Sequence, residues 1–194
     1  MKPLTYPKAV GGVLERHGFI KRPKRTDWFR REGEYEDVID LQLSSCFIDI
    51  TSNIWVSNMA VDAFISNSAA GQYNEWPHHP VSKRVSHLMG PLDHWWKRSD
   101  PDGPANLAAA IEEHAVPFVD RMHSLSAMAD HLGRFAIKWR SPKAQMHLAV
   151  IRSRLGDIAG AVETLDSPAK RLRPEFVLQI KNLQDRIRAG ETIP

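Results

Sequence analysis

Four histidines of this chain fall close enough together to raise the question of a metal site: His78, His79, His87 and His94. A zinc site needs three or four ligands that converge on the ion. The adjacent pair could turn toward one ion only from a loop. No second cysteine accompanies Cys46, and the remaining histidines follow no ligand spacing. We therefore expect no metal and no other cofactor.

Side chains for acid–base or nucleophilic catalysis are equally scattered. The chain has no Gly-x-Ser-x-Gly elbow, phosphate loop or dinucleotide fingerprint. The candidate carboxylates are Asp37, Asp40 and Asp49, and each would need burial or a close like charge to perturb its pKa. The sequence favours a protein without catalytic residues. The alternative is a hydrolase that uses Asp49 together with the loop histidines.

Two consecutive strands are predicted over residues 35–43 and 46–56, because apolar and polar side chains alternate there with a period of two. One face of this antiparallel sheet is expected to be core. It would carry Tyr35, Ile39, Leu41, Leu43, Cys46, Ile48, Ile50, Ile54 and Val56. Cys46 would thus be a small buried hydrophobe, and a single cysteine allows no internal disulfide.

The second face of this sheet is the candidate binding surface. Tryptophan, tyrosine and arginine are the residues most often found at binding hot spots. Trp28 and Arg30 share one side of a further strand predicted over residues 26–32. The expected binding residues are Trp28, Arg30, Gln42, Phe47, Asp49, Asn53 and Trp55. Alternatively, the helices after residue 104 cover this face and make its aromatic side chains part of the core.

The elements around these strands predict an α+β fold with a meander sheet. A helix over residues 7–17, ended by Gly18, precedes a short strand at Phe19 and Ile20. Glu32, Gly33 and Glu34 are typical of a hairpin turn. Residues 66–80 predict a long loop, and short strands are expected over 81–88 and 92–96. Trp95 and Trp96 should point to opposite sides of the latter.

The chain after residue 104 reads as helical. Pro117 predicts a kink, and Ser141 with Pro142 predicts a helix start. The turn at Gly156 joins two helices in a way similar to one hairpin of a tetratricopeptide-type repeat, and a last helix begins near Pro174. We expect residues 1–122 to form an α+β sheet domain, with residues 123–194 as a helical C-terminal extension packed on it.

Charge is unevenly distributed, although the net charge of the chain is only +3. Residues 1–31 are strongly basic, whereas residues 32–75 contain acids but no lysine or arginine. The basic cluster from Lys21 to Arg31 could follow a phosphate backbone. Hairpin pairing would instead place the acidic block against it. We expect mutual neutralisation, and nucleic-acid or phosphate-ligand binding is the alternative.

Length and composition predict a soluble globular protein. The chain has 194 residues, of which 42% are hydrophobic and 25% charged. No run of about 18 apolar residues predicts a membrane span, and no apolar segment near the N-terminus predicts a signal peptide. We expect a cytoplasmic protein without a membrane partner, and its oligomeric state stays open.

Several short motifs occur together in an order that resembles a known family. They are His17-Gly18-Phe19, Trp28-Phe29-Arg30-Arg31, Val38 to Gln42, Asn53-Ile54-Trp55-Val56, Asp93-His94-Trp95-Trp96 and Ala115-Val116-Pro117-Phe118. This order, over about residues 8–125, resembles the uncharacterised bacterial family called domain of unknown function 4304. The resemblance implies an α+β domain with an antiparallel sheet and transfers no catalytic residue.

We therefore expect a non-enzymatic module that binds another protein through the second face of the sheet and the loop 66–80. Some small bacterial families of this style act as immunity proteins against toxins, so an immunity role is the most concrete form of the hypothesis. This link is an analogy between folds.

Overall fold

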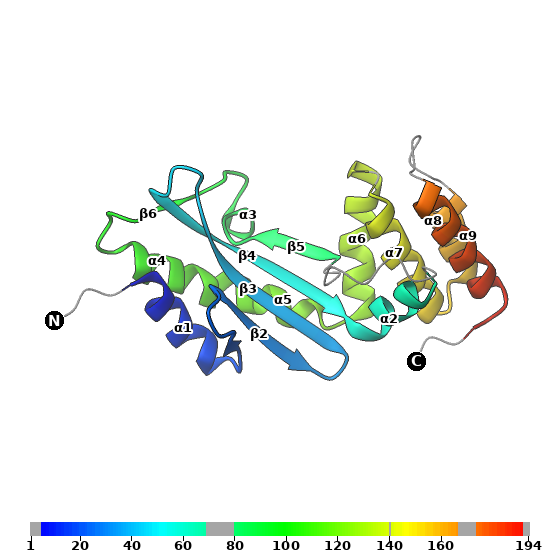
Figure 1. The fold of residues 1–194 in the computed structure, drawn as a ribbon, viewed down its shortest axis with the longest axis horizontal. Coiled ribbons are helices and arrows are strands. Elements are labelled where there is room, and N and C mark those ends of the chain that lie inside the picture. Colours follow the sequence, from blue (N-terminus) through cyan, green and yellow to red (C-terminus); the bar gives the residue numbers. More distant parts are fainter. Residues whose placement is uncertain (1–4, 69–79, 140, 167–173, 192–194) are drawn as a thin grey trace. The chain divides into compact units, whose positions relative to one another are not determined.

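A computed structural model describes residues 5–68, 80–139, 141–166 and 174–191 (Figure 1). The chain divides into two compact units. The sheet unit comprises residues 1–56 and 82–121, and the helical unit comprises residues 57–81 and 122–194. The expected domains, 1–122 and 123–194, differ from these units mainly in the segment 57–81, which belongs to the helical unit. None of the helices in the described ranges is long and apolar enough to cross a membrane.

The first unit contains an antiparallel sheet and a layer of helices, as the α+β prediction required. Its strands are β1 (Ile20–Lys21), β2 (Asp27–Glu32), β3 (Tyr35–Leu43), β4 (Asp49–Asn58), β5 (Val81–Arg84) and β6 (Trp96–Lys97). Its helices are α1 (Tyr6–Arg16), α3 (Ser86–Met89), α4 (Gly103–Ala110), the π-helical segment η1 (Ile111–Ala115) and α5 (Val116–Met122). The strands lie in the order β1-β2-β3-β4-β5, and β6 pairs with β4.

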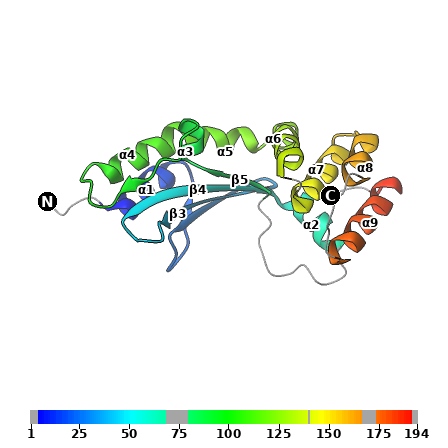
Figure 2. The ribbon, with the colours of Figure 1, turned by 90° about the horizontal axis from the view of Figure 1, so that it is seen from above.

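The helices of this unit lie on one side of the strands, which defines a core face and an open face (Figure 2). The core face includes Trp28, Ile39, Ile50 and Ile54, which are all buried. Val10 and Leu14 of α1 are fully buried. The open face carries Asp27, Phe29, Arg31, Glu36, Val38, Asp40, Gln42, Asp49, Thr51, Asn53 and Trp55. Among the described residues of the sheet unit, no helix lies over the open face, so the alternative of a helix-covered second face is wrong for this unit.

The expected position of Trp28 on the open face is wrong. In the antiparallel pair β2–β3, Trp28 lies opposite Ile39 and Asp27 lies opposite Asp40. Residues directly opposite each other point to the same side, so Trp28 shares the core face with Ile39. Its side chain is fully buried, and a Cβ on Gly11 of α1 would approach its ring to 3.3 Å. Glycine at position 11 therefore allows α1 to pack closely on the indole.

The expectation that Cys46 and Ile48 are buried is also wrong. Strand β4 begins at Asp49, and the preceding residues form the turn of the β3–β4 hairpin. Ile48 is 62% exposed, and Cys46 is exposed. Phe47, expected on the second face, adopts a left-handed φ of 59° in this turn. Ile50 and Ile54 keep the predicted core positions because they follow the start of regular pairing.

A π-helical segment replaces the kink predicted at Pro117. The N–H of Val116 donates to the carbonyl of Ile111, five residues earlier. Pro117 has no N–H, and its ring would clash with the carbonyl of residue 113 in a regular helix. Widening the preceding turn into a π-helix relieves this clash.

In the helical unit, α2 (Met59–Asn67) was not predicted, because its first residues continue directly from β4. Asn58 is the N-cap, and its Oδ1 accepts from the N–H of Val61 at 3.1 Å. The other helices are α6 (Leu125–Trp139), α7 (Pro142–Arg154), α8 (Ile158–Asp166) and α9 (Pro174–Arg188). The predicted N-cap at Ser141 is confirmed. So is the hairpin of α7 and α8, in which Gly156 has a φ of 85°.

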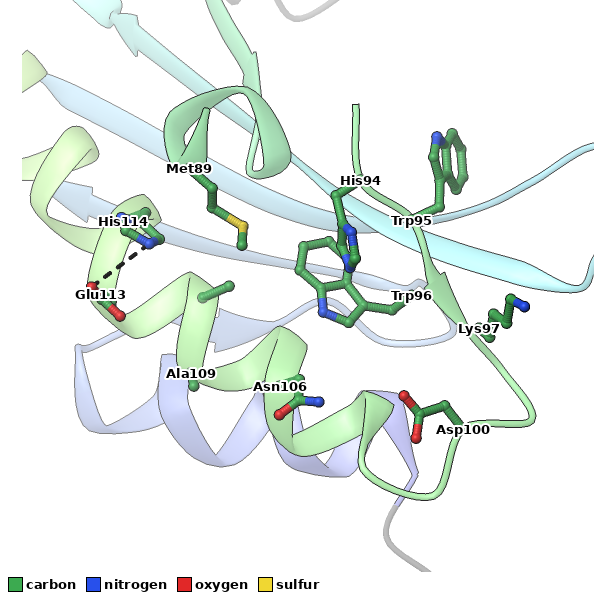
Figure 3. Close-up of a pocket in the computed structure, with 11 residues that line it drawn as sticks. Met89, His94, Trp95, Trp96, Lys97, Asp100, Asn106, Ala109, Glu113 and His114 are labelled. Carbon is green, nitrogen blue, oxygen red and sulfur yellow. Dashed lines mark ion pairs between the residues drawn. The ribbon is translucent and has the colours of Figure 1, made fainter. Parts of the chain in front are cut away.

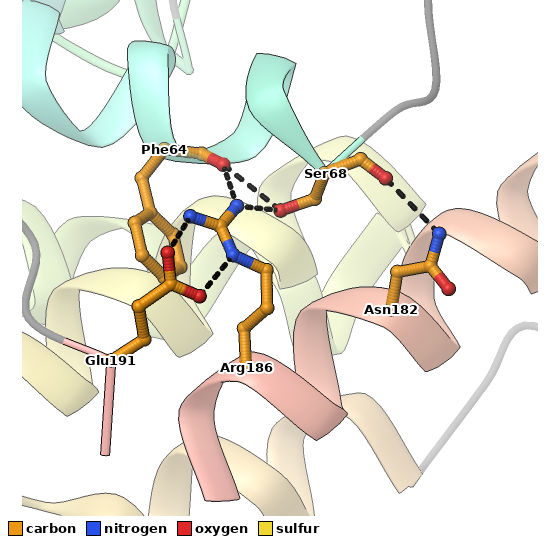
Figure 4. A network of polar contacts seen from close by, with 5 residues as sticks. All are labelled: Phe64, Ser68, Asn182, Arg186 and Glu191. Carbon is orange, nitrogen blue, oxygen red and sulfur yellow. Dashed lines mark hydrogen bonds and ion pairs between the residues drawn. The ribbon is translucent and has the colours of Figure 1, made fainter. Parts of the chain in front are cut away.

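Arg186 of α9 holds the C-terminal end of α2 within the helical unit (Figure 4). Its guanidinium donates to the carbonyl of Phe64 at 2.8 Å and also bonds Ser68. Both carboxylate oxygens of Glu191 accept from it at 2.6 Å. Asn182 donates to the carbonyl of Ser68 at 3.3 Å. Side chains from α9 thus satisfy carbonyls that the end of α2 leaves without helical partners.

Candidate functional site

The centre of the open face is a hydrogen-bonded group around Asp40. Asp40 Oδ1 accepts from the backbone N–H of Asn53 at 3.2 Å and from its side-chain amide at 2.9 Å. The same amide donates to Gln42 at 2.9 Å, and the side chain of Trp55 also hydrogen-bonds Asp40. Three predicted binding residues, Gln42, Asn53 and Trp55, are therefore brought together around Asp40. Asp40 was a candidate catalytic carboxylate but was not among the expected binding residues.

The surroundings of Asp40 disfavour the charged form of its carboxyl group. Burial is the main cause that raises its pKa, and the charge of Asp27 adds to it. The hydrogen bonds from Asn53 and Trp55 oppose this rise without cancelling it. Asp27 itself pairs with Arg22 at 3.1 Å, whereas the hydrogen bonds of Asp40 come from neutral amides and an indole. A cation placed over Asp40 would relieve the cost of its charge.

The raised pKa of Asp40 predicts a pH-dependent effect of Asp40→Asn on stability. The folded state holds the proton more tightly than the unfolded state, so wild-type stability falls as pH rises from the unfolded to the folded pKa. Asparagine does not titrate. The stability of Asp40→Asn relative to wild type should therefore increase as the pH rises from the ordinary carboxyl pKa of about 4 through the raised folded-state pKa of Asp40. Urea unfolding at several pH values measures it, and a difference that is constant with pH would contradict the expectation.

A second polar group borders the open face at β6. Lys97 lies opposite Asp49 and Trp96 lies opposite Ile50, so Trp96 points to the core face and Trp95 to the other side, as predicted. The Arg84 guanidinium stacks on the Trp95 ring at 4.8 Å and pairs with Asp93. Asp93 also accepts from Ser86 at 2.8 Å and from Trp95 at 3.1 Å. The open face thus presents half-buried Trp55 and Trp95 beside fixed polar groups.

The end of β3 and the turn that follows it carry exposed apolar side chains. We call this segment the hairpin tip, which comprises Leu43, Cys46, Phe47 and Ile48. Phe47 is 65% exposed although its positive φ is unfavourable for a bulky residue. Arg98 fixes this conformation, because its guanidinium donates to the carbonyl of Phe47 at 2.8 Å and its N–H to that of Ile48 at 2.9 Å.

Cys46 lies beside this strained residue. The hydroxyl of Ser44 and the N–H of Ile48 hydrogen-bond its sulfur and lower the pKa of the thiol. Nothing in the sequence pattern signalled this position, because the alternation of apolar residues continues through the turn.

Arg30, another predicted binding residue, lies on the core face. Its guanidinium pairs with Asp37 at 3.0 Å and with Asp120 of α5 at 2.6 Å. It also donates to the carbonyl of His17 at 3.4 Å and stacks on Phe19 at 4.8 Å. Only 13% of its side chain is exposed, and that of Asp37 is fully buried. Arg30 therefore joins β2 and β3 to α1 and α5 and has a structural role.

The expected neutralisation of the basic cluster by the acidic block is confirmed for Arg22, Arg30 and Arg31. Arg22 pairs with Asp27 at 3.1 Å and with Glu36 at 3.7 Å. Arg31 pairs with Glu36 at 2.6 Å. The register of β2 with β3 places Arg31 opposite Glu36, and the turn between β1 and β2 places Arg22 beside Asp27. Arginines engaged in this way are less available to a phosphate backbone.

The histidines do not form a metal centre in the part of the chain that the structure describes. No group of three or more His, Cys, Asp or Glu side chains there is placed to hold an ion. His87 and His94 are exposed, whereas His78 and His79 lie outside the described residues, as does most of the loop 66–80. His147 is buried in the helical unit, where Nε2 lies 2.9 Å from Asp62 and Nδ1 lies 2.7 Å from the carbonyl of Lys143.

Comparison with known proteins adds no relative. No protein-family model matches the chain, no curated protein matches it, and no solved structure matches it. The function must therefore be inferred from the surfaces themselves.

Proposed function

We propose that this protein is a non-enzymatic module that binds another protein through the open face and the hairpin tip of the sheet unit. The observation that carries the proposal is the surface of Asp40, Gln42, Asn53 and Trp55, which hydrogen bonds hold in place and no described helix of this unit covers. Fixed side chains lose little entropy on association, which favours binding.

The electrostatics of this surface indicate the chemistry of the partner. Asp40 and Asp27 lie opposite each other, and the bonds to Asp40 come from neutral groups. An arginine or lysine of a partner would neutralise Asp40 with a charge-assisted hydrogen bond. The adjacent half-buried Trp55 could stack on such a side chain, because cations are attracted to the faces of aromatic rings.

The hairpin tip supplies the apolar part of the same surface. A strained, exposed phenylalanine persists only where the surrounding structure enforces it, and such strain clusters at functional sites. Phe47 is held by Arg98, and the next residue Ile48 and the strand-end residue Leu43 are also exposed. The partner would therefore present a basic side chain next to an apolar pocket that receives Phe47. Inhibition of a toxin is one form that such binding could take.

The test uses affinity purification from cells of the source organism, followed by titration calorimetry with the purified partner. Trp55→Ala, Asp40→Asn and Phe47→Ala should each weaken binding by at least about tenfold, as expected for central interface residues. Glu15→Ala, at an exposed position of α1, should leave affinity unchanged. A partner that binds all three open-face variants as tightly as wild type would overturn the proposal. Salt-sensitive binding of oligonucleotides in place of a protein would support the nucleic-acid alternative.

A further inference from the structure

A pocket of about 530 Å³ lies in the sheet unit between β6 and the helical segment α4–η1, and its lining extends to Trp95 at the border of the open face (Figure 3). Its floor is formed by Trp96, whose ring meets His94 edge to face with centroids 4.6 Å apart. Met89 and Ala109 add apolar surface. This volume is within the range of small-molecule sites, which combine apolar walls with a few polar groups.

The polar side chains of this pocket come from one face of the helical segment α4–η1 and from the turn before it. Asn106, Glu113 and His114 recur at helical spacing, and Asp100 lies at the other end. The π-helical turn Ile111–Ala115 carries Glu113 and His114 to the pocket.

The pocket is lined by two carboxylates, Glu113 and Asp100, and by one lysine, Lys97, so the net charge of its lining is negative when the histidines are neutral. Glu113 and Asp100 contribute carboxylates, and the side chain of Glu113 is 76% exposed, with His114 at 3.8 Å. Lys97 follows Trp96 in β6 and lies opposite Asp49 of β4. Alternation along the strand directs its side chain to the opposite side from Trp96. Figure 3 shows Lys97 directed away from Trp96.

The hydroxyl group of Tyr6 is also affected by the negative charge near Asp100. Its hydroxyl donates to the carbonyl of Lys97 at 2.8 Å. Burial first, and then the charges of Asp100 and Asp49, raise the pKa of this phenol. This negative potential would repel an anionic ligand and attract a cation.

We propose that this pocket binds a small organic cation of the arylalkylammonium type. The aromatic part would lie against Met89, Ala109 and the ring of Trp96, which lines the pocket. The ammonium group would lie at Glu113, with Asn106 as an additional acceptor. Carboxylate and amide oxygens accept from an ammonium, which has only donors. The pocket adjoins the proposed protein-binding surface at Trp95, but none of Asp40, Gln42, Asn53, Trp55 and the hairpin tip lines it.

The probe pair is phenethylamine and 2-phenylethanol, which have the same ring and chain length and differ in the ammonium group. Ligand-observed NMR and calorimetry with the full chain at neutral pH measure both. Phenethylamine should bind at least about fivefold more tightly, because only it gains from the carboxylates. Absence of binding by phenethylamine, or equal affinity for the two compounds, would overturn the proposal.

Two variants locate the bound probe. Glu113→Gln should weaken phenethylamine about threefold to fivefold and leave 2-phenylethanol unchanged. Ala109→Leu fills the pocket from an exposed helix position and should weaken both compounds, whereas Ala105→Leu, exposed on the same helix but outside the pocket, should weaken neither. Phenethylamine binding that survives both Glu113→Gln and Ala109→Leu would show that it binds elsewhere and would contradict this site.

Discussion

Arg30→Met is expected to lower the free energy of unfolding by about 3 kcal/mol, because it removes the cation that compensates a buried carboxylate. Arg30 and Asp37 are 3.0 Å apart, and the Asp37 side chain is fully buried. Methionine keeps the length of the apolar stem against Phe19 but cannot pair with Asp37 or Asp120. Urea unfolding followed by tryptophan fluorescence measures the loss, since Trp28, Trp55, Trp95 and Trp96 all belong to the sheet unit.

Arg31→Met is the matched control for this prediction. Arg31 is adjacent in β2 and also pairs with a glutamate, but 62% of its side chain is exposed. Exposed pairs contribute up to about 1 kcal/mol. The double variant Arg30→Met/Asp37→Leu should recover much of the loss, because it removes the uncompensated charge as well. Equal losses for Arg30→Met and Arg31→Met would contradict the structural role of Arg30.

Trp28→Ala is expected to cost about 3–5 kcal/mol, which is the usual range for removing a buried aromatic side chain. Trp28 is fully buried and packs against Gly11 of α1. Its Nε1 has no hydrogen-bond partner among the described atoms. Trp28→Phe should therefore cost much less than Trp28→Ala, since it keeps an aromatic ring and removes a buried unsatisfied donor. Denaturant midpoints at constant m-value give both differences.

Trp55→Ala is the comparison that separates the two faces of the sheet. Trp55 is half-buried on the open face, so its removal should cost about 1 kcal/mol, as for an average substitution. The same variant should abolish most partner binding, which Trp28→Phe should preserve. If Trp28→Ala were as mild as Trp55→Ala, the assignment of Trp28 to the core face would be wrong.

The predicted elements agree best with the structure where a local signal suffices. Alternation in residues 35–43 identified β3, Gly18 and Gly156 marked helix ends, and Ser141 marked a helix start. Helix α2 could have been found from Asn58, whose side chain caps it. No Gly or Pro separates β4 from α2, so the sequence pattern does not mark the change from strand to helix.

The candidate binding residues show which placements a local sequence pattern can predict and which it cannot. Gln42, Asn53 and Trp55 follow from the parity of β3 and β4, and the structure places them around Asp40. Trp28 and Arg30 were assigned to the same face because the parity of one strand does not reveal its register with the next. Cys46 and Phe47 fit the alternation of a strand in the sequence, but Phe47 has a left-handed φ and both residues form a turn. The pocket beside Trp96 gave no sequence signal, since β6 and α4 meet only in the folded chain.

The amino-acid sequence by itself determined the periodicities of this protein, its helix ends and the opposition of a basic to an acidic segment, because these depend on neighbours along the chain. Only the tertiary structure decided which side of the sheet each residue occupies. A shift of one residue in strand pairing exchanges the two faces, and the pairing of Asp27 with Asp40 placed Trp28 and Arg30 in the interior while leaving the two carboxylates together on the open face.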